Sequence, residues 1–200
     1  MYMYSLFVDT HDVKVCLVLF KDEEILAIKE LESNMRHSEI AMPSLVAILD
    51  ENKLNPRDLS EIIVNVGPGS FTGVRIGVVI AKTMAYLLNI PIKTVNSLEI
   101  IAFSSDDIIS GIYAISEKNG YFVGKCNNKM IKDQDVRYYS EEEFKDNFVS
   151  TQVNIDGKVD YKKMYLHVKN KSFVNPHLVN PLYVKKIEVL KWLLNLTKSI

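Results

Sequence analysis

Short apolar runs joined by tight polar turns occupy the first third of the chain. Three such runs, rich in Val, Ile, Leu and Phe, lie at residues 4–9, 13–20 and 25–31. Their length predicts β-strands, and the short turns predict an antiparallel meander. Apolar residues at helical spacing then predict a helix over residues 37–51, with Ser38 as its candidate N-cap and Pro43 either kinking it or lying in its first turn.

The pattern is clearest in residues 62–88, which read IIVNVGPGSFTGVRIGVVIAKTMAYLL. A run rich in β-branched residues meets a turn of Gly, Pro and Ser, and a long apolar-periodic segment follows. This order predicts a strand, a tight turn and a helix. Gly67 and Gly69 can adopt turn conformations or permit close backbone approach, and Ser70 or Thr72 can cap the helix.

Small residues recur every fourth position along this helix and therefore share one face. They are Gly73, Gly77, Ala81 and Ala85. Such a stripe predicts close packing against the chain's own sheet, against a neighbouring helix or against another subunit. A membrane-spanning helix is not predicted, because Arg75 and Lys82 interrupt the run and no stretch reaches about 18 uninterrupted apolar residues.

A further strand is predicted over residues 91–95, followed by a helix that Asn96 or Ser97 would cap. The resulting order is three strands, helix, strand, helix, strand, helix. This is the order of the ribonuclease H-like half of the actin-like ATPase (ASKHA) fold, so the prediction is an α/β protein whose first lobe holds a mixed five-stranded sheet.

From about residue 108 the pattern restarts in a reduced form. Asn119-Gly120 predicts a hairpin, and Ser140 before three glutamates predicts a helix start. Weaker patterns predict a third strand within residues 130–139, a strand at 164–168 and a final helix at 184–196. We therefore expect two lobes, residues 1–105 and a shortened second lobe at 106–200.

Composition is that of an ordinary globular protein, with 48% hydrophobic and 24% charged residues in 200. The N-terminus lacks a signal-peptide pattern, so a cytoplasmic location is predicted. Residues 150–200 hold nine Lys against three Asp and Glu. Aromatic stacking motifs interleaved with these basic residues are missing, so the basic tail favours a solvated surface over a nucleic-acid site.

The glycine-rich turn invites an anion-binding interpretation, because N–H groups at a helix N-terminus attract phosphate. The candidate nucleotide or anion ligands are Asp9, Thr10, Gly67, Gly69 and Ser70. The turn fits neither the Walker loop nor the dinucleotide fingerprint. Cysteine and histidine spacings do not predict a metal site, and no nucleophile–base pair can be placed. We therefore predict no catalytic residues and no metal site.

Several segments resemble one family. The run VGPGSFTGVRIG, continued by AKTMAYLLNIPIKTVNSLEIIA, is similar to the signature of the TsaB (YeaZ) family. FVDT near the N-terminus, RHSEIAMPSLVAIL and NPLYVKK add to the resemblance. TsaB proteins are non-catalytic paralogues of TsaD (Kae/Gcp) in bacterial synthesis of threonylcarbamoyladenosine, the modified adenosine beside the tRNA anticodon. The resemblance extends through about residue 105.

The resemblance implies a scaffold subunit that binds and activates TsaD through its first lobe. It also implies a homodimer in the absence of TsaD, TsaE as a further partner, only indirect contact with tRNA, and ATP or ADP at the TsaD interface in some members. The implied interface residues are Ile40, Ser44, Gly73, Gly77, Ala81, Lys82 and Ala85. The chain departs from the family pattern at Asn65-Val66, where a Gly-Arg pair is usual, and at residues 114–117, where Asp-Ala-Arg is common.

Two alternatives remain open on sequence grounds. Asp9 with the glycine turn could belong to an actin-fold ATPase or kinase, or to a glycoprotease-like hydrolase, acting alone. A homodimeric structural protein without a role in tRNA modification is the third interpretation.

Overall fold

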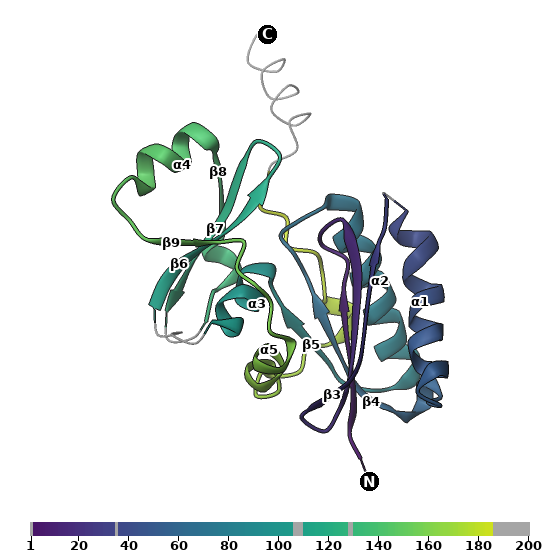
Figure 1. The fold of residues 1–200 in the computed structure, drawn as a ribbon. Coiled ribbons are helices and arrows are strands. Elements are labelled where there is room, and N and C mark those ends of the chain that lie inside the picture. The colour runs from purple at the N-terminus through teal and green to yellow at the C-terminus, as the bar shows by residue number, and fades with distance from the viewer. Residues whose placement is uncertain (1, 35, 106–109, 128–129, 186–200) are drawn as a thin grey trace.

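The computed structural model describes residues 2–34, 36–105, 110–127 and 130–185. Its first sheet has the order β3-β2-β1-β4-β5 (Figure 1). The strands are β1 Tyr4–Asp9, β2 Lys14–Lys21, β3 Glu24–Glu32, β4 Leu59–Asn65 and β5 Ile92–Val95. β1, β2 and β3 pair antiparallel, whereas β4 runs parallel to both β1 and β5. The predicted meander and mixed five-stranded sheet are confirmed.

Helices cover both faces of this sheet (Figure 1). α1 (His37–Glu51) and α2 (Phe71–Leu88) lie side by side on one face, and α3 (Ser97–Ser104) and α5 (Tyr161–Val168) lie on the other. Successive side chains of β1 point to opposite faces of the sheet, which explains the helical layer on each face. Leu6 and Val8 pack towards α1 and α2, and Phe7 packs towards α3 and α5.

The helix caps agree only partly with prediction. Ser70 caps α2 by accepting a hydrogen bond from the Gly73 N–H, and Asn96 caps α3. The prediction of Ser38 as a cap was wrong: α1 already begins at His37, and its N-cap Arg36 makes no capping side-chain bond. Pro43 lies inside α1, beyond its first turn.

The second sheet has the order β8-β7-β6-β9. Its strands are β6 Ser110–Glu117, β7 Gly120–Asn127, β8 Arg137–Ser140 and β9 Val153–Ile155. The predicted hairpin joins β6 to β7, and Ser140 caps α4 (Glu141–Phe148). The strand predicted within residues 130–139 begins only at Arg137, because Asp133–Asp135 forms a 3-10 turn.

Residues 164–168 were predicted as a strand, and this was wrong. They form the second half of α5, which Asp160 caps through the Lys163 N–H. Met164, Tyr165 and Val168 are all buried against the first sheet. Positions three and four residues apart share a helix face, so the same apolar residues satisfy a helix. The helix predicted at 184–196 lies, apart from its first two residues, outside the described residues. The lobe boundary at 105/106 adjoins residues 106–109, also outside them, and stays a prediction.

After α5 the chain returns across the first sheet as a C-terminal strap, defined here as residues 172–185. Val174 forms an isolated antiparallel bridge with Ile92 on the open edge of β5. The Leu182 N–H then donates to the Val66 carbonyl at 2.7 Å, and the Leu182 side chain packs against the cores of both halves. The strap therefore ties the two halves together beside α2.

One described helix, α2, is by length and composition apolar enough to cross a membrane. Its buried face gives another reason for that composition, because Val74, Val78, Ala81 and Ala85 belong to the core beneath it. A single core helix of this kind is weak evidence for a membrane span.

Candidate functional site

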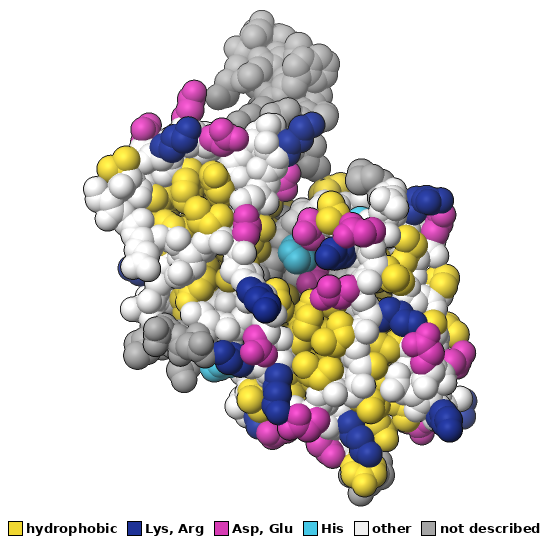
Figure 2. All heavy atoms as spheres, in the orientation of Figure 1, with side chains coloured by type: hydrophobic (Ala, Val, Ile, Leu, Met, Phe, Trp, Pro, Cys, Tyr) yellow, Lys and Arg dark blue, Asp and Glu magenta, His cyan; other side chains and the backbone are white. Residues whose placement is uncertain are grey.

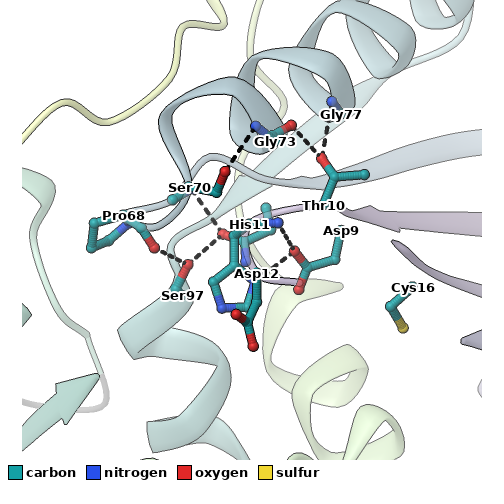
Figure 3. Close-up of polar contacts among 12 residues, drawn as sticks. Asp9, Thr10, His11, Asp12, Cys16, Pro68, Ser70, Gly73, Gly77 and Ser97 are labelled. Atoms are coloured by element: carbon teal, nitrogen blue, oxygen red, sulfur yellow. Dashed lines mark hydrogen bonds and ion pairs between the residues drawn. The ribbon is translucent and has the colours of Figure 1, made fainter. Parts of the chain in front are cut away.

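The turn between β1 and β2 meets the start of α2 (Figure 3). The Ser70 N–H donates to the His11 carbonyl at 2.6 Å. The Thr10 hydroxyl donates to the Gly73 carbonyl at 2.7 Å and accepts from the Gly77 N–H at 3.0 Å. The β1–β2 turn, about 60 residues earlier in the chain, therefore holds the first two turns of α2 in place.

Three glycines make this approach sterically possible. A Cβ atom added at Gly69 would overlap the His11 carbonyl oxygen, and one at Gly73 would overlap the Thr10 carbonyl oxygen. At Gly77 it would overlap the Thr10 hydroxyl. The glycines of the GPGSFTGVRIG run therefore serve close packing between two segments of the same chain.

The small-residue stripe of α2 faces inward. Gly73, Gly77, Ala81 and Ala85 are all buried, which supports packing on the chain's own sheet among the alternatives. Their predicted contact with a partner stays a prediction, and in this fold these four residues are buried. Ser44 is buried as well, Ile40 is half-buried against the core, and the Lys82 ammonium donates to the Val179 carbonyl at 2.9 Å.

The exposed faces of α1 and α2 carry other apolar residues instead. We call these the partner face: Met42, Val46, Val79, Tyr86 and Leu87. Leu87 is 74% exposed and Val79 58%. Helical periodicity marks two opposite faces of α2 without saying which one meets the core, so contact of either face with a partner stays a prediction.

Asp9 and His11 form an ion pair at the end of β1 (Figure 3). One Asp9 oxygen lies 2.7 Å from His11 Nδ1 and also accepts from the His11 N–H at 2.9 Å. Burial alone would raise the pKa of Asp9, but the charge and hydrogen bonds of His11 lower it. Burial alone would lower the pKa of His11, but the Asp9 carboxylate raises it. Each group thus stabilises the charged form of the other.

This pair predicts a pH dependence of folding. The raised pKa of His11 means that its stabilisation is complete below its ordinary value of 6.5 and is lost as pH rises through the raised value. The lowered pKa of Asp9 means that its contribution is present above pH 3.8 and is lost as pH falls through the lowered value.

We expect the unfolding free energy of the wild type to fall as pH rises above 6.5, and that of His11→Asn to lack this fall. Urea unfolding across pH 5–9 measures it; His177→Asn is the matched control, and parallel profiles of wild type and His11→Asn would contradict the pair.

All five candidate anion ligands converge at this junction, but most of their polar groups are already bonded. Thr10 and Ser70 bond to α2, and Asp9 bonds to His11. Asn65, which sequence reasoning treated only as a departure from the family pattern, orders the turn: its Oδ1 accepts from the Gly67 N–H at 2.9 Å and from the Ser97 hydroxyl at 3.1 Å. Anion binding by this set stays a prediction.

A groove between the two halves borders the junction, and charged side chains and a histidine gather there (Figure 2). One hollow of about 470 Å³ is lined by Asp9, His11, Cys16 and Tyr161, among others. The Cys16 thiol donates to the Tyr161 hydroxyl at 3.0 Å, and burial raises its pKa. A protonated, buried thiol is not an activated nucleophile.

Within residues 2–34, 36–105, 110–127 and 130–185, no three His, Cys, Asp or Glu side chains are grouped so that they could hold a metal ion.

Comparisons with known proteins find partial matches to proteins of tRNA threonylcarbamoyladenosine synthesis. The family model described as TsaD, tRNA N6-adenosine threonylcarbamoyltransferase, matches residues 28–111. A Bacillus subtilis protein named tRNA threonylcarbamoyladenosine biosynthesis protein TsaB is 42% identical over 116 residues, which are 56% of this chain and 50% of that protein. A Buchnera aphidicola protein of the same name is 29% identical over 119 residues, 56% of this chain and 53% of that protein. The chain spans about half the length of these curated relatives.

A solved structure extends the likeness in fold beyond this region. A Pseudomonas aeruginosa protein, described as uncharacterized with similarity to peptidase YEAZ, superposes with a TM-score of 0.73 at 17% identity. The match covers 92% of this chain and 100% of that one. At this identity the likeness concerns the fold alone.

Proposed function

We propose that the chain belongs to the TsaB (YeaZ) family and acts in the synthesis of threonylcarbamoyladenosine in tRNA. Its role there is that of an accessory subunit that binds and activates a TsaD-type transferase. The observation that carries this proposal is the partner face of α1 and α2.

The partner face has the character of a docking surface. α1 and α2 lie side by side on one face of the sheet (Figure 1). They bury their inner residues on the sheet, yet each leaves large apolar side chains in solvent. Exposed apolar side chains that gather on neighbouring elements are typical of protein–protein interfaces. In the absence of TsaD, the same face would pair two copies of the chain, and TsaE would join the assembled complex.

An accessory role also accords with the chemistry of the groove. The candidate groups at the β1–β2 turn are already bonded within the chain, Thr10 to Gly73 and Asp9 to His11, and burial raises the pKa of the Cys16 thiol. An ATPase or hydrolase acting alone would need a base and a nucleophile that face bound substrate. A nucleotide that takes part in the reaction would bind at the interface with TsaD, where TsaD supplies the ligands that this chain lacks.

Val79→Glu is expected to weaken binding to TsaD by on the order of 10- to 100-fold, because a charge in the centre of an apolar interface loses its hydration without a partner. Val79 is exposed in the middle of α2, so the substitution spares the core. Size-exclusion chromatography and calorimetric titration with TsaD from the same organism measure the effect, and a threonylcarbamoyl-transfer assay follows activation.

Val149→Glu provides the matched control. Val149 is 83% exposed and lies at the end of α4. α4 packs on the second sheet, away from α1 and α2 (Figure 1). This variant should bind and activate TsaD as the wild type does. Equal affinity of the wild type and Val79→Glu would refute the partner face, and full transferase activity without this chain would refute the accessory role.

A further inference from the structure

The outer side of β3 is the longest strand edge that the described part of the chain leaves open. β3 spans nine residues and lies at one end of the first sheet (Figure 1). Among the described residues, no strand or isolated bridge pairs with its outer side. At the other end of the sheet, the strap partly closes β5 through the bridge between Val174 and Ile92. The edge strands of the second sheet, β8 and β9, have only four and three residues.

β3 carries little of the protection that edge strands usually have. Natural edges are blunted by proline, by lysines that point outward or by bulges. β3 has no proline, and the ammonium of its one lysine, Lys29, donates to Glu51 of α1 at 2.6 Å. A bulge at Leu26 breaks the register near the start of the strand, but residues 27–32 pair regularly with β2. These residues, which we call the β3 edge, are therefore free to pair with a further strand.

The side chains of the β3 edge alternate between the two faces of the sheet. Ile28, Glu30 and Glu32 lie on the face against which α5 packs. All three are exposed, Ile28 by 48%. The Tyr161 hydroxyl donates to Glu30 at 2.8 Å. On the opposite face, Leu31 is 42% exposed. An added strand would therefore meet two carboxylates beside an apolar residue on one face and an apolar residue on the other.

The charge of the β3 edge favours a basic partner. Among the described residues, no cation lies within 4 Å of Glu30, and Glu32 meets only the exposed Lys14 ammonium, at 3.7 Å. Opposite charges across two strands stabilise their pairing, and like charges destabilise it.

A second copy of the β3 edge is a poor partner for the same reason. In a two-fold antiparallel pairing, residues opposite each other share a face of the sheet. Within residues 27–32, Glu30 would then lie opposite Ile28, Glu30 or Glu32 of the other copy. None of these pairings neutralises its charge.

We propose that the β3 edge binds an extended, basic segment of a partner protein by adding it as a further strand to the first sheet. Two Lys or Arg residues of the segment lie beside Glu30 and Glu32, and its alternate residues are apolar and lie on the face of Leu31. In such strand addition the main-chain bonds supply affinity and the alternate side chains supply specificity. This binding goes beyond the proposed accessory function and does not depend on TsaD.

The test titrates the full-length chain, without partners, into a fluorescently labelled peptide in which Lys and Val alternate. Binding is followed by anisotropy. Glu30→Gln combined with Glu32→Gln is expected to weaken binding roughly 10-fold, because two cross-strand charge pairs are lost. Glu141→Gln is the matched control, since Glu141 is an exposed glutamate of α4 on the second sheet, and it should bind as the wild type does. A peptide of the same composition with its Lys residues grouped at one end should bind more weakly, because its charges do not follow the alternation of a strand.

Amide hydrogen exchange locates the bound peptide. Slower exchange of residues 27–32 in the complex, with exchange in α4 unchanged, would support strand addition. Unchanged exchange along β3, equal binding of the grouped peptide, or full binding by a folded double variant would overturn it. Self-association of the wild type that the alternating peptide disrupts would assign the β3 edge to a second copy and overturn the choice of partner. Val79→Glu should keep peptide binding, so this outcome is separable from the fate of the partner face.

Discussion

Lys93→Met is expected to lower the free energy of unfolding by about 3–5 kcal/mol, because it leaves the Glu61 carboxylate buried without its counter-ion. Lys93 Nζ lies 2.8 Å from Glu61, and each side chain is only 4% exposed. Glu61 also accepts from the Ser5 hydroxyl, and Lys93 donates to the Lys169 carbonyl at 2.8 Å. The pair thus links β1, β4 and β5 to the end of α5. Urea unfolding at neutral pH measures the loss.

Two further variants separate the buried charge from the loss of a surface pair. Glu61→Leu combined with Lys93→Met should recover much of the stability, since both charges are then gone. Lys162→Met removes an exposed ion pair with Glu24 at 2.7 Å and should cost less than about 1 kcal/mol. A Lys93→Met protein as stable as Lys162→Met would show that the buried pair contributes nothing.

Gly73→Ala is expected to destabilise the protein by about 1–3 kcal/mol, the usual cost of forcing atoms into a packed interior. The new methyl group would overlap the backbone carbonyl of Thr10, which cannot rotate away as a flexible side chain could. Ala otherwise favours a helix over Gly by about 1 kcal/mol, so a loss of stability would be evidence for the steric conflict.

Gly111→Ala is the control for Gly73→Ala. A Cβ atom at Gly111 meets nothing closer than 3.4 Å, where it touches the Tyr113 ring. This variant should be as stable as the wild type or more so. If Gly73→Ala were the more stable of the two, the close approach of the β1–β2 turn to α2 would be wrong.

The wrong prediction of a strand at residues 164–168 has a physical cause. Residues 161–168 read YKKMYLHV, and a short apolar cluster of this kind is compatible with either a strand or a helix. The burial of Met164, Tyr165 and Val168 against the first sheet, together with the Asp160 cap, decides for the helix. Caps with strong local signals, such as Ser70 and Ser140, were predicted correctly because the signal lies within a few residues of the element that it begins.

By itself the sequence determined the strand–turn–helix at residues 62–88, the mixed five-stranded sheet and the helices α1 and α2, because local spacing encodes them. Only the tertiary structure decided that the small residues of α2 meet Thr10 and the core, that Glu61 pairs with Lys93, and that Phe71 meets Tyr183. Those contacts join residues far apart in the chain. Periodicity defines the faces of an element but not the neighbours that each face will meet.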